Sequence, residues 1–519
     1  MNIFKRNKHD KIMSSSVGKG AVVLTVGGLV CKLFGGLFRL PLTNIIGLRG
    51  IAVFQMVMTI YSFAIVVVSG GVTNSLSKLV SSARARGEHK AIGGYLKNAL
   101  IFSLVASGLF AFVFLLFSRG ISSFQGAIEA DASYKLLSLM LPLGALIGVG
   151  RGVIQGYGDM SPTAISQIIE QVLKFAFGLI FAYLFIKNGI AGGVFGAILG
   201  IVVSELFACL YIGVKLKKKT KVEFVSGYKN QFYKAALPLT FGGLILPLSH
   251  TIESLFIVKL LAFSGLSQEV AASIYGIQTG VVGAILNFPL VVSLALSAAL
   301  LPNLSFMAEQ GDYIGQKTSI AKAMHAMWFL LVPLVVGIMA VAGKLYPLIY
   351  PRAIEGYLDI ALQLTYVTGI SIMATALMQQ LVAILQANGF FRDSMVFYII
   401  GGVAKIIVLV VVAITPSVSP FSIAVSNIVL AAVVCLCVII KMRGIIALSF
   451  FDLSLPLVAS AVVFMVVQIL LSFTSVLIGL ILSVFIGAAL YFVLCLPLTS
   501  KYLNVVYNTL KKKVNKFAK

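Results

Sequence analysis

The chain has 519 residues, of which 60% are hydrophobic and only 11% are charged, and its mean hydropathy is +1.05. Soluble domains carry roughly 45–50% apolar and about 25% charged residues, so a set of soluble domains is excluded. The net charge of +24 also suits a nucleic-acid binder. The basic residues, however, lie mainly in short loops and tails, as membrane topology requires, so we expect no nucleic-acid partner.

Apolar runs long enough to cross a bilayer recur along the whole chain and predict an all-α polytopic membrane protein. Of the 40 Lys and Arg residues, 28 fall on the side of the N-terminus (Arg151 counts with these loops), 6 on the opposite side and 6 within the spans. This bias predicts that both termini are cytoplasmic. The first apolar run is far longer than a signal peptide, which predicts a retained helix. The fourteen expected spans are residues 18–46, 52–81, 92–117, 134–155, 162–186, 190–214, 235–262, 268–300, 319–343, 357–386, 392–414, 420–440, 454–473 and 476–498.

Two segments of the chain resemble each other and indicate an internal repeat. "QGYGDMSPTAISQIIEQVLK" runs from Gln155 to Lys174, and "QANGFFRDSMVFYIIGGVAK" runs from Gln386 to Lys405. Each has Gly at its fourth position, and a second match joins the Gly-acid turns at residues 87–88 and 311–312. Two copies of six helices share one orientation, and transporters of this kind bind substrate between the halves. The expected organisation is a cytoplasmic N-terminal tail (1–17), an N-lobe (18–216), a basic linker (217–234), a C-lobe (235–441), two further helices (453–498) and a basic tail (499–519).

The first span contains two cations without a local counter-ion. Lys32 and Arg39 are seven residues apart, which places them on nearly the same helix face. The first acidic residue after Asp10 is Glu88, so no carboxylate lies within helical reach. Arg39 is near enough to the outer end to snorkel, whereas Lys32 is deeper. Because intramembrane charges are costly, we expect both to face a cavity that binds an anion such as phosphate or pyrophosphate.

Other ionisable residues within the spans leave alternatives open. Glu170 and Lys174 have the i, i+4 spacing of a helical ion pair, which would make them a self-neutralising structural pair or part of the cavity. His250 and Glu253 share a face of the seventh span. Glu253 is either a site for H+ or Na+ coupling or the counter-ion of the cations in the first span. Lys405 is expected to face the interior of the second half.

Motifs of enzymes and metal sites are lacking in the sequence. There is no Gly-rich loop followed by Lys-Ser/Thr, no HExxH and no GxSxG. The four His and five Cys residues lack metal-ligand spacing. We therefore expect no enzyme activity, metal or cofactor, and coupling to H+, to Na+ or to the membrane potential stays open. Interior amides suit sugar or peptide groups, and the nearly uncharged last two spans suit a lipid tail.

Three stretches resemble a known family. They are Lys32-x-x-Gly35-x-x-x-Arg39 followed by Gly47-Leu-Arg-Gly50, the turn "RGVIQGYGDMSPTAISQIIEQ" and the block "NFPLVVSLALSAALLPNLS". They resemble the polysaccharide-transport branch of the multidrug/oligosaccharidyl-lipid/polysaccharide (MOP) exporter superfamily, and within it the stage V sporulation protein B-like and MurJ-like lipid II flippases. The resemblance implies a MATE/MOP-like V-shaped bundle with about 14 helices, a cationic cavity and a groove at helices 13 and 14.

The resemblance also implies a function, which is flipping of undecaprenyl-pyrophosphate-linked peptidoglycan precursor (lipid II) across the bacterial plasma membrane. The chain departs from the family where Lys32 replaces a frequent Arg, where Asn287 replaces an acid and where Ala284 replaces an Arg. Alternatives are a flippase for another polyprenyl-linked polysaccharide or teichoic acid precursor, a cation-coupled multidrug exporter, and a non-transporting scaffold of a cell-wall assembly complex. A drug exporter would favour an acidic cavity.

The predicted site has two groups of residues. The head-group ligands are Lys32, Arg39, Arg49, Lys174 and Lys405, and the cavity or coupling residues are Glu170, Glu253, His250, Gln55, Gln278 and Asn287. The expected partners are a polyprenyl-pyrophosphate-linked glycan lipid, membrane lipids and cell-wall synthesis proteins, with the chain itself a monomer.

Overall fold

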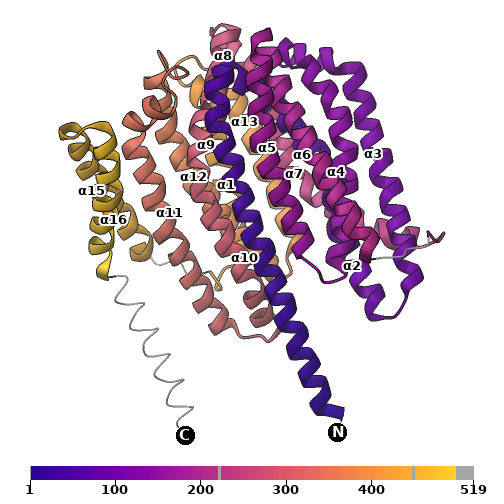
Figure 1. Ribbon diagram of the computed structural model, residues 1–519. Coiled ribbons are helices and arrows are strands. Elements are labelled where there is room, and N and C mark those ends of the chain that lie inside the picture. Colours follow the sequence, from indigo (N-terminus) through magenta and orange to yellow (C-terminus); the bar gives the residue numbers. More distant parts are fainter. Residues whose placement is uncertain (1, 220–223, 447–449, 498–519) are drawn as a thin grey trace. The chain divides into compact units, whose positions relative to one another are not determined.

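The protein is built from helices, and the described residues contain no strand (Figure 1). The computed structural model describes residues 2–219, 224–446 and 450–497, and within these ranges it describes all side chains except those of residues 2–26, 29, 32, 292, 298–303 and 450–452. The elements are α1 (Asn2–Ile65), η1 (Val66–Gly70), α2 (Gly71–Ala85), α3 (His89–Phe124), η2 (Ile128–Ala130), α4 (Asp131–Gly156), α5 (Ser161–Phe185), η3 (Ile186–Asn188), α6 (Gly189–Lys219), α7 (Lys229–Phe263), α8 (Gln268–Gly276), η4 (Ile277–Val282), α9 (Gly283–Leu286), α10 (Phe288–Glu309), α11 (Tyr313–Ile349), α12 (Leu358–Ala387), α13 (Phe391–Ile414), η5 (Ser419–Phe421), α14 (Ser422–Lys441), α15 (Phe450–Phe473) and α16 (Val476–Leu494).

Among the described residues, twelve helical stretches are long and apolar enough to cross a membrane. Two of them, with 53 and 59 residues, are long enough for two crossings each, because about 20 residues span the hydrocarbon core. The first is interrupted at Gly47, where the backbone leaves the helical region (φ 73°, ψ 179°). The second contains α5 and α6, which are separated by η3 and by Gly189 at φ 81°. Fourteen crossings therefore fit the sequence prediction of an all-α polytopic protein.

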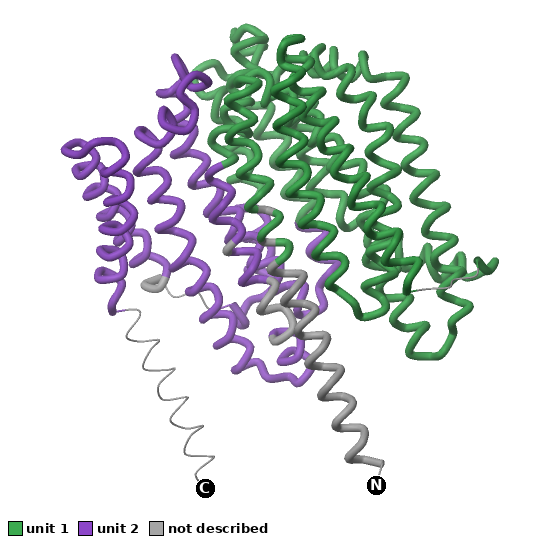
Figure 2. The backbone as a smooth tube through the Cα atoms, viewed as in Figure 1, with its two compact units in different colours: residues 1–284, 398–430 green, residues 285–397, 431–519 purple. Residues whose placement is uncertain are grey.

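The chain forms two compact units (Figure 2). Unit 1 contains residues 1–284 and 398–430, and unit 2 contains residues 285–397 and 431–519. Helices α13 and α14 each contribute residues to both units. The six-helix lobes on either side of linker 217–234 are a division by sequence repeat, and they stay a prediction.

Within unit 1, α1 packs against α5, α6, α7, α8 and η4, and α5 packs along α6. The α5–α6 contact depends on small residues. A Cβ added to Gly200 would lie 2.3–2.4 Å from the backbone N and Cα of Gly178. Only glycine allows these backbones to approach so closely. The tight α5–α6 pair packs against α1.

Within unit 2, side chains fasten the last two helices to α11. Trp328 of α11 donates its indole N–H to the Leu453 carbonyl at 2.9 Å. Gln468 of α15 donates to the Ala340 carbonyl at 3.0 Å. Tyr491 of α16 donates its hydroxyl to a further α11 carbonyl at 2.8 Å. All three hydrogen bonds are partly buried, and together they hold α15 and α16 in register on α11.

The turns of the predicted repeat have the same geometry. Gly158 and Gly389 adopt φ of 82° and 83°, a region that favours glycine. Gln155 and Gln386 each donate a side-chain hydrogen bond to the hydroxyl eight positions further on, at 3.4 and 3.3 Å. The predicted correspondence of these two turns is confirmed. The two Gly-acid turns of the second match also share a left-handed glycine, with φ of 73° at Gly87 and 69° at Gly311.

Candidate functional site

Aromatic packing brings two cations together where α1 meets α5. The ring of Phe175 lies 6.4 and 6.5 Å, centroid to centroid, from the rings of Phe34 and Phe38. The ammonium of Lys174 lies 5.3 Å from the centroid of the Phe38 ring, a cation–π contact. Lys174 is also within electrostatic range of Arg39. Like charges side by side inside a membrane are unfavourable unless an anion joins them.

The neighbouring π-helix η4 orients the Arg39 side chain. Arg39 Nη1 donates to the carbonyl oxygen of Thr279 at 3.4 Å. Gln55 Nε2 donates to the same oxygen at 3.3 Å. Single π-helical turns are often found at functional sites because they displace carbonyls from the regular helical pattern. The predicted cavity residue Gln278 is buried in the same turn.

A third cation comes from α4. Arg151 Nη2 lies 3.1 Å from Glu170 Oε2, and Arg151 Nε donates to Ser166 at 2.9 Å. The side chains of Arg151 and Glu170 are only 15% and 24% exposed. Sequence spacing groups Arg151 with the loops and pairs Glu170 with Lys174, whereas the structure joins Glu170 to Arg151. The sequence does contain a sign that Arg151 could belong to the site, because this residue lies near the end of the expected span 134–155 and not in a loop. We call Arg39, Arg151 and Lys174 the cation cluster.

The second carboxyl group near the cation cluster belongs to Glu205 of α6. It is buried, and the hydroxyl of Tyr61 donates to its Oε1 at 2.5 Å. Within the described part of the chain, its Oε2 has no hydrogen-bond partner. The sequence gives Glu205 no partner in its own helix, which leaves pairing with another helix open, and the predicted site does not include it. Among the residues that the structure describes, the cluster therefore has two carboxyl neighbours, one in an ion pair and one held by a neutral hydroxyl, against three cations.

A separate ion pair joins α7 to α13 within unit 1. Lys405 Nζ lies 2.7 Å from Glu253 Oε2 and 3.1 Å from His250 Nδ1. The Lys405 side chain is 0% exposed. An ammonium only donates, so the imidazole nitrogen accepts from it. The partner of Glu253 is thus Lys405. These contacts disfavour the alternative from the sequence, in which Glu253 is the counter-ion of the cations in the first span.

The remaining predicted residues lie elsewhere. Arg49 pairs with Glu129 at 2.8 Å, and both side chains are about a quarter exposed, at 25% and 26%. Asn287 is exposed, directly precedes α10 and belongs to unit 2. Lys32 lies on α1, but its side chain is outside the described residues. The site roles of all these residues stay predictions. Among the described residues, no group of three or more His, Cys, Asp or Glu side chains could hold a metal ion.

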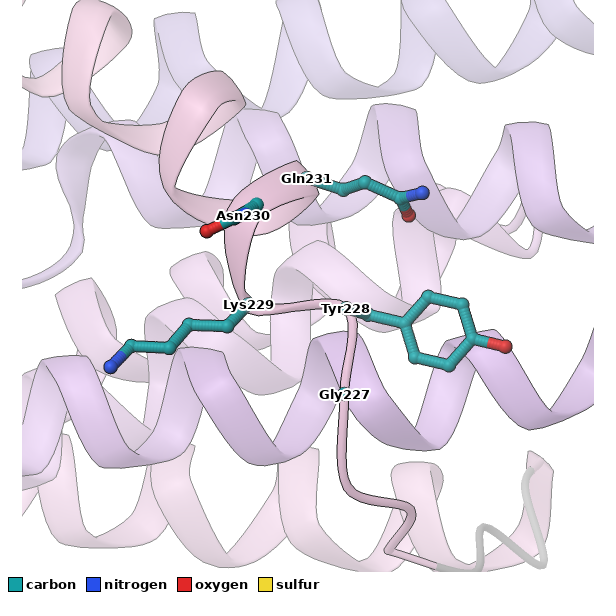
Figure 3. Close-up of a pocket in the computed structure, with 5 residues that line it drawn as sticks. All are labelled: Gly227, Tyr228, Lys229, Asn230 and Gln231. Carbon is teal, nitrogen blue, oxygen red and sulfur yellow. The ribbon is translucent and has the colours of Figure 1, made fainter.

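A cavity of about 500 Å³ lies where the linker enters α7 (Figure 3). Tyr228 has left-handed backbone angles (φ 60°), and its ring lies against that of Tyr95 on α3 with 5.4 Å between centroids. The side chains of Tyr228 and Lys229 point in opposite directions (Figure 3). A Cβ on Gly94 would lie 2.5 Å from the Tyr228 ring, so glycine makes this contact feasible. Residues 226–228 of the linker, which sequence analysis treats as a plain break, therefore pack against α3. The cavity is lined by Gly227, Tyr228, Lys229, Asn230 and Gln231.

Apolar helices of this length, with ionised side chains placed among them, define a multi-pass membrane protein. The family model described as "Polysaccharide biosynthesis protein" matches residues 17–308, more than half of the chain, and the protein belongs to this family. It is 28% identical over 307 residues to stage V sporulation protein B of Bacillus subtilis (strain 168), covering 56% of this chain and 58% of that protein. It is 25% identical over 364 residues to lipid II flippase MurJ of the same organism, covering 65% and 66%. The chain thus spans less than two thirds of the length of these relatives.

Two solved structures share the fold. One is lipid II flippase MurJ in an inward closed conformation, with a TM-score of 0.71 at 14% identity, covering 93% of this chain and 100% of that one. The other is a multidrug resistance MATE family transporter of the MOP superfamily in an inward-facing conformation, with a TM-score of 0.64 at 16% identity, covering 82% and 98%. The resemblance to stage V sporulation protein B-like and MurJ-like proteins that the sequence motifs indicate is confirmed.

Proposed function

We propose that the protein is a flippase for a lipid-linked glycan precursor, that lipid II is its cargo, and that it works by alternating access. The observation that supports the proposal is the cation cluster, where Arg39, Arg151 and Lys174 converge from three helices. A charge within a membrane span is costly, up to about 2.5–3.5 kcal/mol at mid-bilayer on insertion scales, so an excess of cations among the spans calls for an anionic ligand.

The chemistry of the cluster fits a diphosphate. Guanidinium groups offer planar pairs of donors to phosphate oxygens, and an ammonium adds a compact charge. Gln55 adds an amide close by, suited to sugar hydroxyls. The sequence prediction adds Lys32 to this set. A cationic drug would be repelled by such a cluster, which disfavours the multidrug-exporter alternative.

The similarity to proteins named lipid II flippase and stage V sporulation protein B supports a polyprenyl-linked cargo. In this proposal the protein lies in the bacterial plasma membrane with both termini in the cytoplasm, as the distribution of Lys and Arg predicts. The apolar outer surfaces of α15 and α16 suit the polyprenyl tail. The departures at Lys32, Ala284 and Asn287 concern the identity of the carried head group and the coupling.

The test is transport in proteoliposomes that contain fluorescent lipid II. Wild type should expose the label to an external reagent, and Arg39→Ala should lose most of this activity. Arg49→Ala is the matched control, because Arg49 already has Glu129 as its partner. Equal rates for wild type and Arg39→Ala would contradict the proposal. Mass spectrometry of copurified lipid distinguishes lipid II from another polyprenyl-diphosphate glycan, since the cluster fits the diphosphate that both share.

A further inference from the structure

Glu205 is a buried acid that head-group binding does not use directly. It is 4% exposed, its Oε1 accepts from Tyr61, and its Oε2 is buried without a hydrogen-bond partner among the described residues. No cation of the described residues lies within ion-pair distance of it. An ionised carboxylate in such a place is costly, whereas a carboxylic acid is tolerated because it is neutral. The geometry therefore suits a carboxyl group that carries a proton.

The surroundings of Glu205 connect this proton to the cation cluster. From α4 and α5, Arg151, Lys174 and Glu170 lie within electrostatic range of it. From α1, Tyr61 holds its Oε1, and Arg39 acts on Lys174. A change in the charge of Glu205 therefore changes its electrostatic interaction with the cation cluster. Of the other titratable groups on neighbouring elements, Cys209 lies one turn further along α6, Lys187 of η3 precedes α6, and Glu129 of η2 is paired with Arg49.

We propose that Glu205 is a proton-binding site linked to the head-group site. With the proton on Oε2, the surroundings of the cluster lose one negative charge, and an anionic head group binds more tightly. When the proton leaves for water, the carboxylate competes with the head group for Arg151 and Lys174. Only an O–H bond forms or breaks, and water is the other partner in both directions. The inference rests on the proposed function, because the affinity that the proton controls is that of the diphosphate.

Linkage makes the effect reciprocal, so the bound anion also holds the proton on Glu205. The test uses geranylgeranyl diphosphate as the probe and measures its Kd for the purified protein from about pH 5 to about pH 9, a range that includes the titration of buried carboxyl groups. In wild type the affinity should fall by about tenfold more over this range than in Glu205→Gln. Glutamine keeps the size and the acceptor for Tyr61, and the titration of the probe itself is the same in both proteins. Glu269→Gln, an exposed site on α8, is the matched control and should follow wild type.

A second measurement observes the proton directly. Infrared difference spectra should contain a carboxylic-acid carbonyl band that disappears at high pH and is absent from Glu205→Gln. Absence of the band from wild type would overturn the proton site. Parallel affinity curves for wild type and Glu205→Gln would overturn the linkage. Failure of every protein to bind the probe would refute the proposed function and the linkage with it, while the band would still decide whether Glu205 binds a proton.

Discussion

Lys174 and Lys405 occupy the same position of the repeat, yet their surroundings differ. Lys174 lies over the ring of Phe38, at 5.3 Å, and within electrostatic range of another cation, Arg39. Lys405 is fully buried and lies 2.7 Å from Glu253. The difference comes from the helix that each lysine faces. In the first half α1 supplies an arginine, and in the second half α7 supplies an acid, so one lysine joins the proposed anion site and the other is neutralised.

This contrast indicates that the two halves of the repeat have diverged in chemistry while keeping their turns. A buried, paired ammonium is a poor ligand for cargo, because releasing it would leave Glu253 as an uncompensated buried charge. We therefore infer that Lys405 fixes α13 to α7, and that the head group binds in the first half. The sequence prediction that Lys405 is a head-group ligand would require this pair to open.

The largest effect is expected for Lys405→Met. It leaves Glu253 unpaired in the interior and should lower the free energy of unfolding by about 3–5 kcal/mol. Thermal unfolding in detergent measures this as a lower Tm. The double variant Lys405→Met/Glu253→Leu removes both charges and should recover most of the loss. An unchanged Tm for the single variant would show that the pair is not structural.

Unlike Lys405→Met, the variant Lys174→Met should lower the affinity for the probe and leave the stability nearly unchanged. Among the described residues, Lys174 has no carboxylate within ion-pair distance that its loss would leave unpaired, so Tm should stay near that of wild type. Affinity for geranylgeranyl diphosphate should fall by about 10- to 100-fold, the value of one hydrogen bond to a charged group. Calorimetry measures both quantities on one sample. A large loss of Tm with unchanged affinity would mean that the roles of the two lysines are reversed.

A smaller effect is expected for Gln55→Leu. It removes one of the two donors to the Thr279 carbonyl, worth about 1 kcal/mol, and loosens the turn that orients Arg39. Probe affinity should fall several-fold. Gln55→Asn, which keeps an amide on a shorter side chain, should fall between the leucine variant and wild type. If Gln55→Leu binds as wild type does, η4 does not position Arg39.

The smallest effect is expected for Arg49→Gln. Its pair with Glu129 is about a quarter exposed, so its loss should change stability by about 0–1 kcal/mol. Probe affinity and its salt dependence should stay unchanged. A tenfold weaker affinity would restore Arg49 to the head-group site that sequence analysis predicts.

Much of the fold could be predicted from the sequence, because the length of each span and the bias of charge between loops depend only on the order of residues along the chain. Glycines at turns also carry their own signal, as Gly158 and Gly389 demonstrate. The pairing of charges between helices could not be predicted in this way. The i, i+4 rule favours Lys174 as the partner of Glu170, but the rotation of α4 brings Arg151 closer. In the same way, Glu253 has several candidate cations in the sequence, and only the packing of α7 selects Lys405.

The most direct measurement is lipid II transport in proteoliposomes by two variants that each lose one lysine of the repeat. Lys174→Met is compared with Lys405→Met/Glu253→Leu, at equal amounts of folded protein. We predict that the first loses most of its transport rate and that the second keeps a rate near that of wild type. A wild-type rate for Lys174→Met, together with a large loss in the double variant, would contradict the assignment of the head group to the first half.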